Sequence, residues 1–167
     1  PRDDRDYRYL VLDNRLRVLL ISDSTADKAA AALDLDIGSR HDPDERLGFA
    51  HFLEHMLFLG TEKFPEAGEY QRYISSHGGS NNASTGFEHT NYYFELDQAH
   101  LRGALERFSQ FFVAPLLDAE YVDRERNAVH SEYQARLKSD GSRTWDATKQ
   151  VFNAAHPLSR FSVGSLK

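Results

Sequence analysis

Polar and apolar residues alternate along several short stretches of the chain, and this period of two is typical of half-buried strands. The clearest alternation runs through residues 90–96, where Tyr92 begins a row of three large apolar side chains on one side. In residues 28–38, leucines and Ile37 alternate with aspartates, so one face is expected to be buried and the other wet. Residues 80–85 are polar and are expected to pair with 90–96 through the four residues between them. Five strands are predicted: residues 7–12 and 16–21, joined by a tight turn, then 28–38, 80–85 and 90–96.

Apolar residues spaced three and four apart predict five helices between and after these strands. The most regular stripe runs from Leu101 to Phe112 without a gap and ends before a proline. Pro65 suits the first turn of another helix, which Gly78 would end, and Asp118 suits the cap of a long one. The predicted helices are residues 48–60, 65–77, 101–112, 118–138 and 144–154.

Strands and helices follow one another here without the strand–helix–strand rhythm of a parallel sheet. We therefore predict an α+β fold in which an antiparallel sheet is packed on one side by helices. No linker, repeat or low-complexity tract divides the chain, so residues 1–167 are expected to form a single domain. The chain starts without an initiator methionine and shows no signal peptide, so we expect it to be a piece of a longer protein.

Composition narrows the function before any motif is considered. The net charge is −6, which argues against a nucleic-acid-binding surface, and no run of about 18 apolar residues is present to span a membrane. Cysteine is absent, so a metal would have to be held by histidine and carboxylate side chains. The sequence is compatible with a periplasmic or secreted protein and with a cytoplasmic one. A bacterial origin is expected.

Residues 48–60 contain a pattern that suits a metal. As a helix, they place His51 and His55 one turn apart on one face, with Glu54 beside them. Two imidazoles at this spacing can reach one zinc ion, and a neighbouring carboxylate can accept a proton from a bound water. The His-x-x-Glu-His order is the inverzincin signature. The alternative is that the three side chains are only packed or solvated on an otherwise apolar helix, and a zinc hydrolase needs a third protein ligand as well.

A third ligand is available on the helix predicted for residues 118–138. Glu125 and Glu132 lie on one stripe with two valines, on the face that should be buried. A buried charged carboxylate costs on the order of several kcal/mol unless it is paired or bound to a metal. The alternative for each is a glutamate at the edge of the core that bends to solvent or pairs with an arginine such as Arg126 or Arg136. Two glutamates two turns apart favour one metal ligand and one residue that supports it.

Several of these segments together resemble the pitrilysin–insulysin family of zinc endopeptidases. The resemblance runs from about Tyr7 to the end of the chain and is closer to the insulysin branch than to the mitochondrial processing peptidases. It rests on five ordered motifs: HFLEHMLFLGT from His51, GSNNAST from Gly79, EHTNYYF from Glu88, ERNAVHSE from Glu125, and HPLSRF from His156.

The resemblance implies roles for particular residues. One zinc ion per chain would be bound by His51, His55 and Glu132, with Glu54 as the general base. Glu125 would support the site without binding the metal. Asn82 and Ala83 match an edge strand that pairs with the backbone of the substrate, a mode in which an extended peptide adds to a sheet; without the resemblance, Asn82 would be interpreted as a turn residue.

The resemblance also implies a larger enzyme. The chain would be the N-terminal part of the zinc-binding peptidase domain, and a C-terminal half would close over a peptide substrate. The isolated chain is then expected to be weakly active or inactive. It is also expected to be open to self-association through the edge formed by the helix at residues 48–60 and the strand at residues 80–85. Two alternatives remain: a non-catalytic homologue that binds peptides or serves as a structural subunit, and a processing peptidase for a peptide precursor of a redox cofactor.

Overall fold

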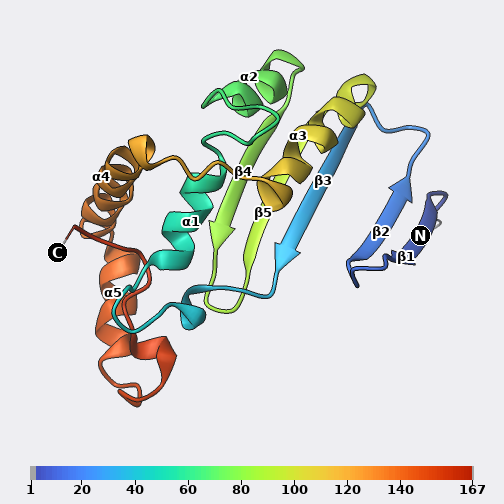
Figure 1. The fold of residues 1–167 in the computed structure, drawn as a ribbon. Helices are drawn as coiled ribbons and strands as arrows, with labels where there is room; N and C mark the ends of the chain where they lie inside the picture. The colour runs from blue at the N-terminus through green and yellow to red at the C-terminus, as the bar shows by residue number, and fades with distance from the viewer. Residues whose placement is uncertain (1–2, 167) are drawn as a thin grey trace.

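The computed structural model describes residues 3–166, and these form five strands and five α-helices (Figure 1). The strands are β1 (Asp6–Val11), β2 (Arg17–Ser22), β3 (Lys28–Leu35), β4 (Ser80–Thr85) and β5 (Thr90–Asp97). The helices are α1 (Phe49–Leu57), α2 (Glu69–Ser76), α3 (Leu101–Val113), α4 (Ala119–Arg136) and α5 (Asp140–Lys149). Single 3-10 turns occur at Ser39–His41, Gln98–His100 and Pro157–Ser159.

The main sheet has three antiparallel strands in the order β3-β5-β4, with helices α2 and α3 on one face (Figure 1). The predicted α+β class with one helix-covered face is therefore confirmed. Tyr92, Phe94 and Leu96 of the central strand are at most 2% exposed. They pack against the apolar stripes of α2 and α3, where Ile74, Phe108 and other buried residues complete the core. Alternation in β5 thus predicted which of its faces is buried.

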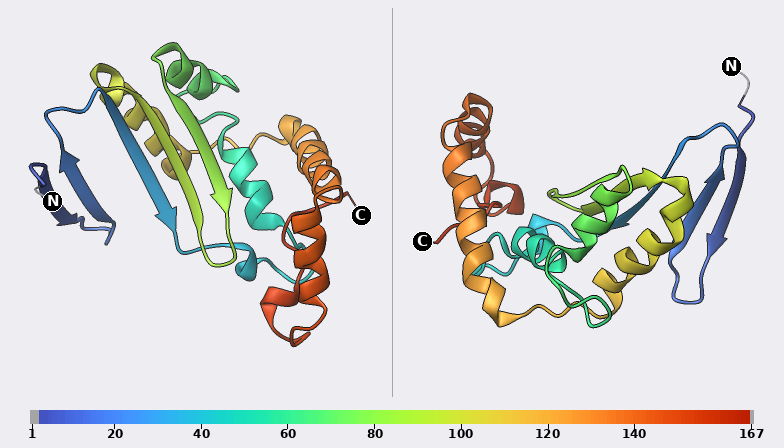
Figure 2. Two further views of the ribbon diagram at one scale, coloured as in Figure 1. Left: turned by 180° about the vertical axis from the view of Figure 1, so that it is seen from behind. Right: turned by 90° about the horizontal axis from the view of Figure 1, so that it is seen from above.

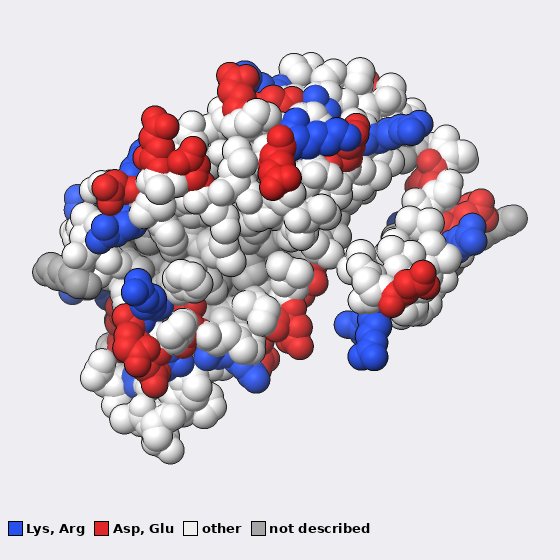
Figure 3. Space-filling model, viewed as in Figure 1, with Lys and Arg blue, Asp and Glu red and all other residues white. Residues whose placement is uncertain are grey.

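Strands β1 and β2 form a separate two-stranded sheet, paired from Asp6↔Ser22 to Val11↔Arg17. The hairpin is confirmed, but it does not pair with the main sheet. A visible gap separates it from the body on the face shown in Figure 3. Large apolar side chains on both of its faces are exposed: Tyr7, Tyr9, Val11, Leu12, Leu16, Leu19, Leu20 and Ile21.

Two predicted boundaries are wrong for backbone reasons. Helix α2 begins at Glu69, because Gly68 before it adopts a left-handed conformation (φ 84°), and Pro65 lies ahead of the turn that the Glu69 amide closes on the Glu66 carbonyl. Strand β3 ends at Leu35, and Ile37 beyond it is 52% exposed rather than buried, since the chain turns there into Ser39–His41.

The last helix was predicted too late in the chain. Helix α5 starts after Ser139, whose hydroxyl accepts a hydrogen bond from the Ser142 amide over 3.5 Å. It ends at Lys149, so residues 150–154 lie outside it. The long helix before it agrees with the prediction, since the Asp118 carboxylate caps α4 by accepting from the Glu120 amide over 2.9 Å.

Helix α1 lies between the β4 edge of the main sheet and helix α4, which it contacts on its other side. Figure 2 shows α4 and α5 at one end of the molecule and the β1–β2 hairpin at the other. In the part of the chain that the structure describes, none of the helices is both long and apolar enough to cross a membrane. The predicted site residues therefore come from three adjoining elements, α1, β4 and α4.

Candidate metal centre

Helix α1 is held at its start by a residue from the loop before it. Gly48 adopts a left-handed conformation and has no side chain with which to cap the helix. The buried Asp42 does this instead: its two carboxylate oxygens accept hydrogen bonds from the Gly48 amide (2.7 Å) and the Ala50 amide (2.8 Å). A carboxylate at a helix N-terminus also interacts favourably with the helix dipole. The motif helix is thereby fixed one turn before its first histidine.

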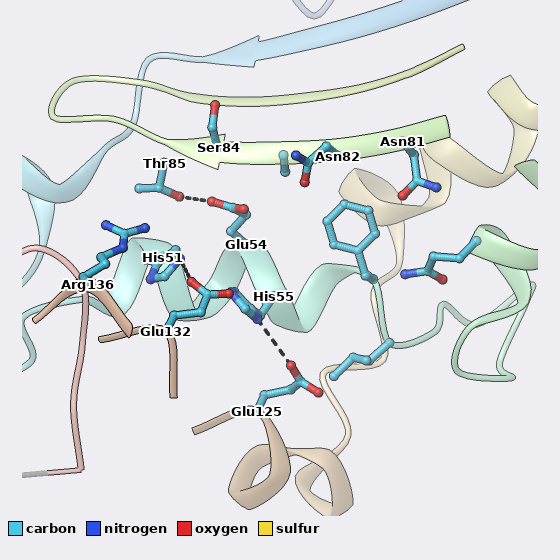
Figure 4. Close-up of a pocket in the computed structure, with 14 residues that line it drawn as sticks. His51, Glu54, His55, Asn81, Asn82, Ser84, Thr85, Glu125, Glu132 and Arg136 are labelled. Atoms are coloured by element: carbon cyan, nitrogen blue, oxygen red, sulfur yellow. Dashed lines mark hydrogen bonds and ion pairs between the residues drawn. The ribbon is translucent and has the colours of Figure 1, made fainter. Parts of the chain in front are cut away.

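The motif brings its two histidines together as predicted. The ring centroids of His51 and His55 are 5.0 Å apart and nearly perpendicular. Glu132 reaches them from α4: its Oε2 lies 3.4 Å from Nε2 of His51, and its Oε1 lies 3.4 Å from Nε2 of His55. The three residues form a group in which one ligand atom from each lies within 4.8 Å of the others. Figure 4 shows the three side chains converging between α1 and α4.

This donor set fits a tetrahedral zinc ion. Tetrahedral ligands at about 2.0–2.2 Å from zinc lie roughly 3.3–3.6 Å from one another, and here each Nε2 lies 3.4 Å from one of the two oxygens of Glu132. Two imidazole nitrogens and one carboxylate oxygen leave a fourth position open, as in catalytic zinc sites. Glu132 is 44% exposed, so its side chain opens onto solvent, although the stripe on α4 predicted that it would be buried.

The remaining nitrogen of each imidazole has its own partner. Nδ1 of His51 lies 2.7 Å from the carbonyl oxygen of Val163, and Nδ1 of His55 lies 3.3 Å from Oε2 of Glu125. A carbonyl or carboxylate oxygen can only accept, so Nδ1 of each ring is the donor in these contacts, and Nε2 is the atom that each ring would offer to a metal. Partners of this kind orient metal-binding histidines and fix their tautomer.

Glu125 is buried, and its second carboxylate oxygen is satisfied as well. Nε of Arg124 donates to Oε1 of Glu125 over 2.9 Å. An ion pair with an arginine is the predicted alternative for this glutamate, with Arg126 and Arg136 as the candidates. The structure pairs Glu125 with the neighbouring Arg124 and with a metal-site histidine at once. Glu125 therefore lies beside the three-residue group rather than in it.

Glu54 points away from the metal group and toward the sheet. It is 8% exposed, and its Oε2 accepts a hydrogen bond of 2.5 Å from the Thr85 hydroxyl at the end of β4. Figure 4 shows this contact on the side of α1 that faces β4. Burial raises the pKa of the nearby Tyr92, and the Glu54 carboxylate raises it further. Glu54 is thus held next to the candidate zinc ligands without being one of them.

The metal group opens into a groove of about 450 Å³ between α1, β4 and α4. Asn82 and Ala83 of β4 line it opposite the histidines. The Gly86 amide donates to the His89 carbonyl over 2.8 Å, so these two residues form a hydrogen-bonded pair. Hydrogen-bonded and non-hydrogen-bonded pairs then alternate along β4 and β5, and the pair of Ala83 with Tyr92 is not hydrogen-bonded. Residue 83 therefore directs its backbone N–H and C=O to the free edge of the sheet, whereas those of residue 82 face β5.

Three contributors to the site could not be assigned their role in it from the motifs. Val163 acts through its carbonyl, which every residue type has. Thr85 belongs to a polar strand in which any of several hydroxyls could have faced α1. Arg136 lines the groove at the end of α4 (Figure 4), where a basic residue is also expected for the helix dipole. Only the folded arrangement distinguishes these residues from their neighbours.

A family model described as "Insulinase (Peptidase family M16)" matches residues 17–160. The chain belongs to this insulinase family. It is 53% identical over 165 residues to an insulin-degrading enzyme of Mus musculus and 49% identical to an A-factor-processing enzyme of Saccharomyces cerevisiae, covering 99% of this chain but 16% of each relative. The crystal structure of pitrilysin superimposes with a TM-score of 0.93 at 43% identity, over 99% of this chain and 18% of pitrilysin. This insulinase-family chain therefore corresponds to about one-sixth of the length of these relatives.

Proposed function

We propose that this chain provides the metal site of a zinc-dependent endopeptidase, with one zinc ion held by His51, His55 and Glu132. One observation carries the proposal. The two Nε2 atoms each lie 3.4 Å from a different oxygen of Glu132, while both Nδ1 atoms are engaged elsewhere. Side chains that only formed ion pairs would not need both rings held through Nδ1 with their Nε2 atoms directed toward one carboxylate. The presence of all three metal-binding side chains favours this function over that of a non-catalytic homologue, which would not need to keep them.

Zinc bound there would polarise a peptide carbonyl and lower the pKa of a coordinated water to about 7, far below its value in bulk water. Glu54 is the proposed general base: it accepts the proton of the attacking water and passes it to the leaving amine. Its burial next to the metal group and its hydrogen bond from Thr85 hold the carboxylate on the side of α1 that faces β4, where the peptide is proposed to lie. Glu125 holds the ring of His55 from behind.

The substrate in this proposal is an extended peptide that lies along β4. The free backbone groups of Ala83 would pair with the peptide backbone, which places the peptide between β4 and α1. Asn82, whose side chain is exposed on the groove, would contact the peptide beyond its backbone. The relatives are named for degrading insulin and for processing A-factor, and these names support small polypeptides as the substrate class.

The test is metal content followed by activity. The purified chain, dialysed with zinc, should hold about one zinc ion per chain by elemental analysis. A His51→Ala/His55→Ala variant should hold none, and His89→Ala, an exposed histidine outside the group, should match the unaltered chain. Retention of zinc by the double variant would exclude this site. We further propose that the chain is part of a longer enzyme, since it spans only 16–18% of its relatives, and peptide hydrolysis is measured with that longer enzyme.

A further inference from the structure

The segment from Arg160 to Gly164, here called the strap, lies against both helices that carry candidate zinc ligands. After α5 the chain turns back toward the space between α1 and α4 (Figure 1). The Val163 carbonyl accepts the hydrogen bond from Nδ1 of His51, at 2.7 Å. The strap therefore fixes the tautomer of His51, as Glu125 does for His55. The two histidines are thus supported by different parts of the chain, His51 by the strap and His55 by α4.

Two glycines allow the strap to come this close. Gly164 is buried with φ 97°, and Gly48, just before α1, has φ 89°. A Cβ atom on Gly48 would lie 2.5 Å from the Cα and N atoms of Gly164, and one on Gly164 would lie 2.9 Å from Cγ1 of Val129 in α4. Both distances are shorter than a Cβ atom tolerates. The strap thus packs its backbone directly on α1 and on Val129, with no side chain between them.

The other end of the strap is tied to the loop that caps α1. The Arg160 guanidinium donates to the carbonyl oxygen of Asp42 and lies 3.4 Å from the carboxylate of Asp44. Nζ of Lys149, from α5, donates to the Arg160 carbonyl over 3.2 Å. Because the Asp42 carboxylate caps α1, the start of the motif helix and the strap share one anchor.

We infer that the strap is a spacer that sets the position of His51 relative to Glu132, and that Gly164 is the positioning residue within it. This inference rests on the proposed zinc site. Productive metal geometry tolerates errors of only about 0.5 Å. A methyl group on Gly164 would push the strap away from Val129 and carry the Val163 carbonyl with it. The ring of His51 would then lose its orientation, while the contact between His55 and Glu125 would remain.

The test compares two alanine substitutions at glycines with similar backbone conformations. Gly164→Ala should weaken zinc binding by about 10–100-fold, the usual effect of losing a group that orients a ligand. Gly68→Ala is the matched control, because Gly68 has φ 84° and a Cβ there would meet nothing within 4 Å. Zinc affinity is measured on the 167-residue chain by competition with a chromophoric chelator, and the melting temperature of the metal-free chain is recorded in parallel.

Two further measurements separate positioning from a general loss of stability. The absorption spectrum of the chain loaded with cobalt(II) should change in Gly164→Ala and not in Gly68→Ala, because it reports ligand geometry. Adding Val129→Ala to Gly164→Ala should restore zinc affinity toward that of Val129→Ala alone, since it removes the atom that the new methyl group meets. If Gly164→Ala does not fold, nuclear magnetic resonance of the unaltered zinc-loaded chain should show a slowly exchanging His51 Nδ1 proton.

The outcomes distinguish the two proposals. Equal zinc affinity and equal cobalt spectra for Gly164→Ala and Gly68→Ala would overturn the spacer role, as would a rapidly exchanging His51 Nδ1 proton. Failure of the unaltered chain to bind either metal would instead overturn the zinc site. Loss of affinity in Gly164→Ala with rescue by Val129→Ala is the expected result.

Discussion

Glu125 accepts a hydrogen bond from Nδ1 of His55 over 3.3 Å, and Glu132, two turns later on α4, faces Nε2 of the same ring. We expect Glu125→Gln to lower the activity of the longer enzyme by about 10–100-fold. The amide oxygen can still accept the hydrogen bond, so zinc should be bound more weakly but not lost. Glu132→Gln should lose zinc more completely, and Glu120→Gln, exposed on the same helix, should behave like the unaltered protein. Equal zinc loss at positions 125 and 132 would show that the third ligand has been misassigned.

Glu54→Gln should keep zinc and lose most turnover in the longer enzyme. Glutamine is nearly the same size but cannot accept the proton, and removal of a general base typically costs about 10²–10⁴-fold. Single-turnover peptide cleavage and elemental analysis on the same preparation provide the measurement. Glu62→Gln, exposed just beyond α1, is the control. Turnover near that of the control, with zinc present, would assign the base to another residue.

The hydroxyl of Thr85 should matter through Glu54. Thr85→Val removes the 2.5 Å hydrogen bond to the carboxylate at nearly constant volume. Hydrogen bonds to charged groups are worth about 1.5–3 kcal/mol, so turnover should fall by about 10-fold or more while zinc content stays unchanged. Thr85→Ser keeps the hydroxyl and should keep most of the activity. If valine and serine variants were equally active, the carboxylate would not depend on this contact.

The 167-residue chain should bind zinc but cleave peptides weakly when it is alone. The groove is open on the side of Glu132, and preorganised donors for a developing oxyanion are worth about 10²–10³-fold each. We expect cleavage of a flexible peptide to appear when the remaining part of the longer enzyme is added as a separate chain. Full activity of the 167-residue chain alone would make it a self-sufficient peptidase.

Zinc should stabilise the attachment of α4. Only Glu125 and Val129 of this helix are buried, so the metal would add a tie between α1 and α4. A ligand at 100 times its dissociation constant stabilises the folded state by about 2.7 kcal/mol. Chelation should therefore lower the melting temperature and speed proteolysis within residues 119–136. The His51→Ala/His55→Ala variant should show no response to zinc or chelator.

The parts of the fold that were predictable from the sequence are those with a strong local pattern. Alternation in β5 identified the buried Tyr92 row, and the spacing of the motif brought His51 and His55 to one face. The start of α2 was missed because the backbone conformation of Gly68 decides it. The Val163 carbonyl was missed because a backbone acceptor 112 residues from His51 carries no residue-type signal.

The expected self-association of the isolated chain has a different candidate surface in the structure. The prediction placed it at the open edge formed by α1 and β4, which is largely polar where Asn82 and Ser84 are exposed. Acidic and basic side chains are also interspersed over the face drawn in Figure 3. The densest group of exposed large apolar residues lies on the β1–β2 hairpin instead. Sedimentation at increasing concentration would distinguish the two surfaces. A Tyr9→Ser/Leu19→Ser variant changes the hairpin, and an Asn82→Ser/Ser84→Ala variant changes the β4 edge.

The separation of the β1–β2 hairpin from the main sheet has a consequence for how the chain opens. A two-stranded hairpin without a packed face is only marginally stable in water, and both faces of this one are exposed. Its amide protons should therefore exchange with solvent through local fluctuations, far faster than those of the buried central strand β5. Residues 6–22 would form a separate folding unit that unfolds first on warming, while the metal-binding helices remain folded.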